Sequence, residues 1–148
     1  MNWIKQKKWV ALLAVLLLAV SLPAAALADA DTTAPGVMLY SPSAYAAVTA
    51  NQKIILSLSE KVTLAGDKNV TVVDGATSYI APVSAGTLVG DLLTDHWYAV
   101  YDLTDFVNGA TPLTLAINTT YTVNVDAGAF ADLAATPNTS AAATGSFT

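Results

Sequence analysis

The chain has 148 residues, which is enough for one domain of ordinary size and not comfortably for two. Hydrophobic residues make up 54% of it and charged residues only 11%, while cysteine is absent. The missing cysteine excludes disulfides, thiol nucleophiles and thiolate metal sites. The basic residues are few and none is arginine, which argues against a nucleic-acid partner.

The N-terminus has the order of a secretory signal peptide, with a basic start, an apolar core and a small-residue end. Lys5, Lys7 and Lys8 form the basic start, residues 9–22 form the apolar core, and small residues follow Pro23. We therefore predict that the first 28 residues are a signal peptide and that the protein is secreted.

Cleavage is expected after Ala28, and cleavage after Ala30 is the alternative. The competing interpretation is an uncleaved membrane anchor, since residues 9–28 number about 20 and could just span a bilayer. The mature chain, residues 29–148, keeps three lysines against eleven acidic residues, a formal net charge of −8. It is therefore not expected to bind nucleic acid, or a membrane other than through an uncleaved leader.

After the leader, short runs rich in Val, Ile, Thr and Tyr alternate with Gly, Pro, Asn and Asp, which is typical of strands and turns. The expected strands are 36–40, 53–62, 70–74, 78–83, 97–103, 120–125 and 144–148. Between them, residues 85–95 are expected to be a loop with at most a short edge strand, and residues 126–138 a long corner.

The clearest alternation is KIILSLSEKV, where Ile54, Leu56 and Leu58 point to one side and the residues between them to the other. A strand of this kind has one buried face. About seven short strands at such spacing predict an all-β fold, a single antiparallel two-sheet sandwich. A closed barrel is the alternative.

Five stretches of the mature chain follow the order of a known family: DTTAPGV at 31–37, SP at 41–42, IILSLSEKV at 54–62, YTVNVDAGAFADLA at 121–134 and FT at 147–148. From Asp31 to Thr148 the chain resembles the bacterial Ig-like domain of S-layer and other cell-surface proteins (the SbsA-like type). The resemblance implies an Ig-like β-sandwich with a non-catalytic structural or adhesive role at the cell surface. It implies a cell-envelope protein or polysaccharide as the partner.

The residues that carry the resemblance have structural explanations. Asp31 can order the first turn by accepting backbone N–H groups, and Pro35 suits the start of an edge strand because it offers no donor. Tyr121 could bury its ring and tie its hydroxyl to a nearby loop, as a tyrosine corner does, and Gly128 can supply a positive φ. Asp132 marks a departure, because LAATPN follows it where the family usually has a Gly-Asn turn, so a longer turn is expected.

The sequence offers few residues that could act in catalysis. His96, the one histidine of the sequence, follows Asp95, but adjacent residues on a strand point to opposite faces and do not converge on a substrate. No phosphate-binding glycine loop, nucleophile elbow or H-E-x-x-H motif is present. The chain is therefore predicted not to be an enzyme and to need no cofactor.

Calcium is the metal to be weighed, because carboxylates near one end of a sandwich could hold it. The aspartates that could gather there are Asp29, Asp31, Asp102, Asp105, Asp126 and Asp132. They are scattered and form no D-x-D-x-D-G loop, so the favoured interpretation is solubility.

Two further functions remain open. A carbohydrate-binding module would use Trp97 or Tyr98 to stack on sugars, although large aromatics on a central strand are more often part of the core. A filament subunit joined by strand exchange is the other possibility, because the mature chain is an apolar sheet protein.

Overall fold

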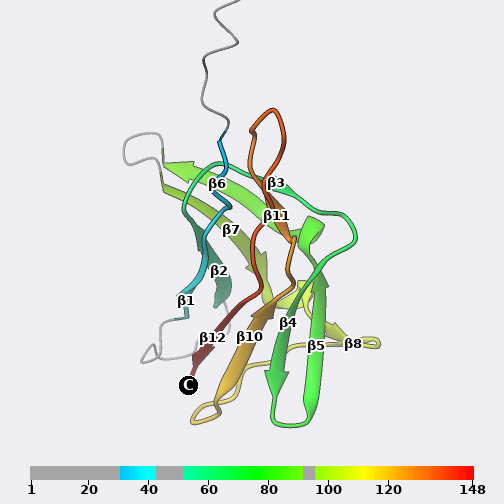
Figure 1. Cartoon of the computed structure of the whole chain (residues 1–148). Helices are drawn as coiled ribbons and strands as arrows, with labels where there is room; N and C mark the ends of the chain where they lie inside the picture. The colour runs from blue at the N-terminus through cyan, green and yellow to red at the C-terminus, as the bar shows by residue number, and fades with distance from the viewer. Residues whose placement is uncertain (1–30, 43–51, 92–95) are drawn as a thin grey trace, which may run out of the picture. The chain divides into compact units, whose positions relative to one another are not determined.

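The computed structural model describes residues 31–42, 52–91 and 96–148 (Figure 1). The chain divides into two units, residues 1–30 and 31–148, and only the second is described. The predicted leader, its cleavage site, Asp29 and Asp95 therefore lie outside the described residues.

The described residues form antiparallel strands and two single-turn 3₁₀ helices. The strands are β1 (Val37–Ser41), β2 (Lys53–Leu58), β3 (Thr63–Leu64), β4 (Asn69–Asp74), β5 (Thr77–Pro82), β6 (Thr87–Asp91), β7 (His96–Asp102), β8 (Val107–Asn108), β9 (Thr111–Pro112), β10 (Tyr121–Val125), β11 (Phe130–Ala131) and β12 (Ala143–Phe147). The 3₁₀ helices are η2 (Val83–Ala85) and η3 (Leu103–Asp105).

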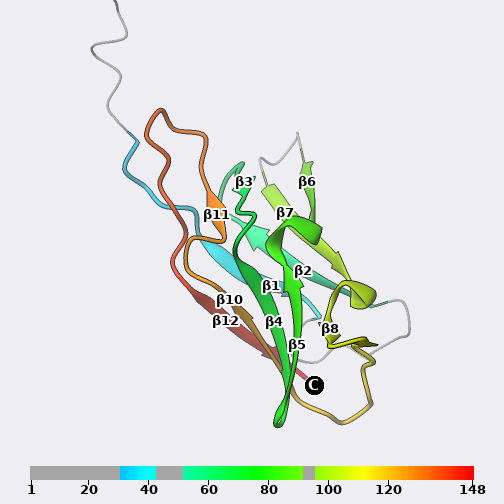
Figure 2. The ribbon, with the colours of Figure 1, turned by 90° about the vertical axis from the view of Figure 1, so that its right-hand side faces the viewer.

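The long strands make a two-sheet sandwich, and the views from two sides show the sheets facing each other (Figure 1, Figure 2). One sheet has the order β1-β2-β7-β6 and the other begins β12-β10-β4-β5, followed by β8 and β9. If the main strands are lettered A, B, C, C′, D, E, F and G in chain order, the sheets are ABED and GFCC′. This is the immunoglobulin arrangement, so the predicted all-β antiparallel sandwich is confirmed.

The core lies between the sheets and is filled by alternate residues of the long strands. Ile54, Leu56 and Leu58 are at most 1% exposed, which confirms the face predicted for this run. The other sheet contributes Val123 of β10 and Phe147 of β12, each 1% exposed. Strands with one buried face therefore supply both walls of a single hydrophobic interior.

The predicted strand 53–62 is four residues too long at its C-terminal end. It ends at Leu58 because Ser59 turns the chain toward the segment before β1: the Ser59 backbone N–H donates to the Gly36 carbonyl at 3.0 Å, and the Gly36 N–H donates to the Ser59 side-chain oxygen at 2.8 Å. The chain then crosses to β3, which pairs with β11 inside the predicted corner 126–138. A connection of this kind depends on a partner that is distant in the sequence, so no local hydrophobic periodicity predicts it.

Candidate functional site

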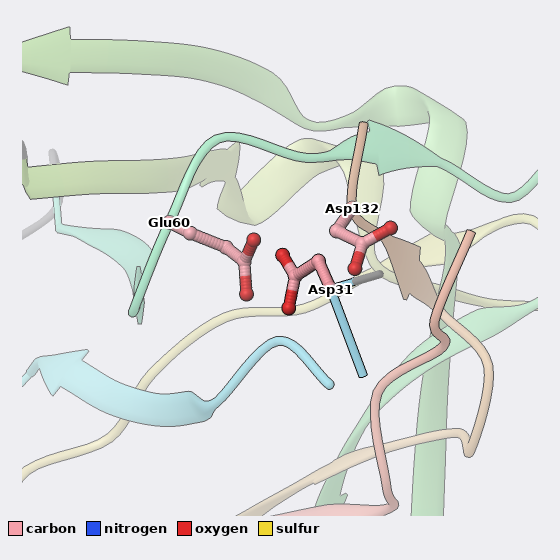
Figure 3. A group of neighbouring side chains, drawn as sticks. All are labelled: Asp31, Glu60 and Asp132. Carbon is pink, nitrogen blue, oxygen red and sulfur yellow. The ribbon is translucent and has the colours of Figure 1, made fainter. Parts of the chain in front are cut away.

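Three carboxylates from distant parts of the chain meet at one place, which we call the carboxylate cluster. Asp31 precedes β1, Glu60 lies in the bend between β2 and β3, and Asp132 follows β11 directly. One carboxylate oxygen from each residue lies within 4.8 Å of the other two, and the three side chains turn toward each other (Figure 3). Within the described ranges this is the one group of three such side chains close enough to share an ion.

Asp132 is the buried member of the cluster, at 2% exposed. One carboxylate oxygen accepts the backbone N–H groups of Ala134 at 3.1 Å and Asn138 at 2.9 Å, and the other accepts the Asn138 side-chain amide at 2.7 Å. The hydrogen bond from the Asn138 side chain is the main reason that the pKa of Asp132 is lowered. Asp132 therefore closes the long turn that follows it, residues 133–138.

The same asparagine ties this turn to the start of the domain. The Asn138 side-chain amide also donates to the backbone carbonyl of Asp31 at 2.9 Å, across 107 residues of sequence. The Asp31 carboxylate accepts the backbone N–H of Thr33 at 2.9 Å, which orders the first turn. Two segments that the sequence could not place side by side are thus fixed together beside β11.

This arrangement disfavours the charged form of Glu60. Partial burial raises its pKa, and the negative charges of Asp132 and Asp31 raise it further. Nothing in the sequence separated Glu60 from the alternating run in which it lies, so it was not among the predicted site residues. Only the break at Ser59 would have brought it to notice.

The N–H groups that donate to Asp132 indicate that it anchors the loop that follows it, which we call its loop-anchor role, and does not bind calcium. Calcium takes six to eight oxygen ligands, and both oxygens of Asp132 already accept N–H groups. Of the aspartates proposed for calcium that the structure describes, only Asp31 and Asp132 come together here. The other three described aspartates have separate partners: Asp102 pairs with Lys53, Asp105 accepts the Asp102 backbone N–H at 2.8 Å, and Asp126 accepts the Asn69 N–H at 2.9 Å.

The two residues proposed for sugar stacking lie on opposite faces of β7. The Trp97 ring faces inward, where it packs against the core, and the Lys61 ammonium lies 5.3 Å from its ring centroid. A Cβ on Gly90 would come within 2.7 Å of that ring, so Gly90 makes room for it. Tyr98 faces outward, and its ring centroid is 5.3 Å from that of Tyr40 at an interplanar angle of 56°.

Tyr98 belongs to the outer surface of the four-stranded sheet. The ladder places Met38, Ser57, Tyr98 and Val89 in one row across the four strands, and Ile55, Val100 and Thr87 in the next. We call this surface the tyrosine face; it consists of Met38, Tyr40, Ile55, Ser57, Thr87, Val89, Tyr98 and Val100. The charged residues and the histidine lie beyond its rows, with the Lys53–Asp102 pair at one end and the cross-strand pair of Asp91 and His96 at the other.

A groove of about 550 Å³ continues this surface around the edge of the sandwich. It lies between the edge strands β1 and β12, and Met38 and Tyr40 line it on the β1 side. The register of β1 shifts between Leu39 and Ser41, so Tyr40 lies in a bulge. A bulge followed by Pro42 leaves the β1 edge poorly suited to pairing with another strand.

The remaining predicted motif residues serve the scaffold. Pro35 is buried just before β1, and Gly128 has a φ of 76°. Tyr121 is fully buried, and its hydroxyl oxygen accepts the Ala116 backbone N–H at 2.8 Å, which ties β10 to the loop that precedes it. His96 is exposed at the first position of β7.

A scan against protein-family models found no match, and neither did searches of curated proteins and of solved structures. Within residues 31–42, 52–91 and 96–148, no helix combines the length and the apolar character needed to cross a membrane.

Proposed function

We propose that residues 29–148 are a non-catalytic Ig-like module, of the type found in S-layer and other bacterial cell-surface proteins, with a structural or adhesive role outside the cell. The leader, residues 1–28, exports it. A cell-envelope protein or polysaccharide is its partner. The module acts passively, as a stable acidic body that spaces or displays a binding surface.

The observation that carries this proposal is the use of the polar side chains. Asp132 closes a turn, Tyr121 ties β10 to a loop, and Asp105 accepts the Asp102 N–H at the start of η3. Among the described residues, no buried side-chain nitrogen or oxygen lacks a hydrogen-bond partner. Groups committed to the scaffold in this way support a structural role, since catalysis needs polar groups that are free to meet a substrate.

Export is tested by expressing the full chain with a C-terminal tag in a bacterium and measuring the mass of the product in the medium and the cell wall. The proposal predicts a product that begins at Asp29, or at Asp31 if the alternative site is used. The matched control is Ala28→Asp, which places a charged residue at both candidate sites and should leave the leader attached. Full-length wild-type chain that keeps Met1 and stays in the cytoplasm would contradict the proposal.

A further inference from the structure

We propose that the tyrosine face binds a neutral polysaccharide made of equatorially linked pyranose rings, as a single chain lying across Tyr40 and Tyr98. This inference rests on the proposed function, because it names the partner class of the adhesive module. It assigns the stacking role to Tyr98 together with Tyr40, and not to Trp97.

Three residues of the tyrosine face are well exposed. Met38 is 71% exposed, Tyr40 59% and Val89 47%, although all three lie on one sheet of a small domain. Scattered surface hydrophobics are ordinary, but Met38 and Val89 lie in one row of the ladder on either side of the half-buried Tyr98, and the Tyr40 ring lies beside that of Tyr98. A contiguous apolar patch of this kind marks an interaction site.

The tyrosine face contains no Asp, Glu, Lys, Arg or His, although the mature chain has a formal net charge of −8. The Lys53–Asp102 ion pair borders the face at one end, and Asp91 pairs with His96 in the ladder at the other, so the charged residues lie outside its rows. An anionic or cationic partner would find nothing on this face to pair with, so the complementary ligand is uncharged.

The area of the tyrosine face favours a sugar chain over a second copy of the protein as its partner. Four strands about 4.8 Å apart, each presenting about five residues of about 3.3 Å, cover roughly 300 Å². A stable protein–protein interface buries about 800 Å² on each partner. The tyrosine face is too small to hold a second copy, whereas a narrow polymer needs only a strip of it.

The side chains of the tyrosine face match the chemistry of a sugar ring. A pyranose ring has an apolar side of C–H groups and a rim of hydroxyls, and a tyrosine matches both with its ring and its hydroxyl. Ser57 and Thr87 supply further hydroxyls on the same face. Because the rings of Tyr40 and Tyr98 are inclined by 56°, they cannot both lie against one flat crystalline surface. A single flexible chain can contact both rings and continue into the groove that Tyr40 also lines.

The test is a titration of the ¹⁵N-labelled mature protein, residues 29–148, with cellohexaose and with chitohexaose, followed by NMR. The inference predicts chemical-shift changes in β1, β2 and β7 with at least one of them, and a loss of affinity of about tenfold in Tyr40→Ala. Tyr98→Phe, which keeps the ring in place if Tyr98→Ala fails to fold, should retain most of the binding. Ile80→Ala is the matched control, because it removes an apolar side chain that is 45% exposed on β5 of the other sheet and should bind as wild type.

Three results would overturn the inference. They are no shift with either oligosaccharide, binding that is unchanged in Tyr40→Ala, or concentration-dependent dimerisation that Tyr40→Ala abolishes. Each of these leaves the export experiment untouched, so a failure of the sugar site can be told apart from a failure of the proposed function. Conversely, a cytoplasmic full-length product would remove the cell-surface setting even if the titration succeeded.

Discussion

Asn138 holds more of the carboxylate cluster together than any of the carboxylates does. Its backbone and side-chain nitrogens both donate to Asp132, and the same side-chain amide reaches the Asp31 carbonyl. One residue thereby links the long turn after β11 to the first turn of the domain. The carboxylate cluster therefore connects two distant segments of the chain, and we call this connection the joint.

Replacing Asn138 tests this joint. Asn138→Ala removes both side-chain hydrogen bonds, so we expect the free energy of unfolding to fall by about 1–3 kcal/mol. The pKa of Asp132 should rise, because the hydrogen bond from Asn138 is the main cause of its lowering. A thermal melt and an NMR titration of the Asp132 carboxyl measure the two effects. Asn108→Ala, at an exposed asparagine of β8, is the control, and equal effects in both variants would refute the joint.

Glu60 and Asp132 make opposite contributions to the pH dependence of stability. The folded-state pKa of Glu60 is raised, so its ionisation lowers stability as pH rises from about 4.5 through the folded-state value. The folded-state pKa of Asp132 is lowered, so its contribution is present above about 3.8 and is lost as pH falls through the folded-state value. The contribution of the carboxylate cluster to stability is therefore greatest between about pH 3.8 and about pH 4.5.

Glu60→Gln isolates the first of these contributions. The variant should melt above wild type at pH 7, where the charge of Glu60 is unfavourable, and the difference should vanish as pH falls below about 4.5. Melting temperatures of both proteins between pH 3 and pH 8, followed by circular dichroism, give the comparison. A variant that is less stable than wild type at pH 7 would show that Glu60 is held by favourable contacts instead.

Calcium provides an independent test of the cluster. Because the oxygens of Asp132 already accept hydrogen bonds, we expect the same melting temperature in excess EDTA and in millimolar calcium. Calorimetric scans under both conditions decide the matter. A rise with calcium that disappears in Glu60→Gln would mean that the cluster is a metal site and that the loop-anchor interpretation is wrong.

Single residues were predictable from the sequence where their role is local. The positive φ of Gly128 and the burial of Tyr121 follow from a turn and an alternating strand. Glu60 could not be found, because its neighbours in the cluster lie 29 and 72 positions away in the printed sequence. The Tyr40–Tyr98 pair was missed for the same reason.

At the scale of elements, the longer strands could be predicted from the sequence and the two-residue strands could not. β2, β7 and β10 each show a period of two over at least five residues, and each was predicted to within about two residues at its start. β3, β8, β9 and β11 have two residues apiece, which is too short for any period. They form because other parts of the chain bring a partner to them, and the hairpin β8–β9 was not foreseen at all.

The contact between β1 and β12 depends on a glycine. A Cβ on Gly145 would lie 2.6 Å from the Leu39 Cβ, so the two edge strands can approach only because Gly145 has no side chain. Gly145→Ala should therefore cost about 1–3 kcal/mol of stability through overpacking. Gly66→Ala is the matched control, since nothing lies within 4 Å of its added Cβ, and it should be neutral or slightly stabilising. Urea denaturation of both variants measures the difference, and equal stabilities would contradict the close approach.

At the scale of the whole molecule, the described residues combine a filled interior with an exposed apolar face on the four-stranded sheet. The core holds side chains from both sheets, while Met38, Tyr40 and Val89 remain exposed on the outer surface of one. The sandwich itself followed from alternation in the sequence. The tyrosine face did not, because it exists only once four strands are placed side by side.

The central claim is that β1 and β12, which belong to different sheets, close one side of a single sandwich. The most direct test is a nuclear Overhauser experiment on the mature protein, residues 29–148, between the α protons of Gly145 and the methyl groups of Leu39. The account predicts strong cross-peaks, because the two residues are in van der Waals contact. If these cross-peaks are absent while those between paired strands within each sheet are present, the sheets do not pack as described and the account is wrong.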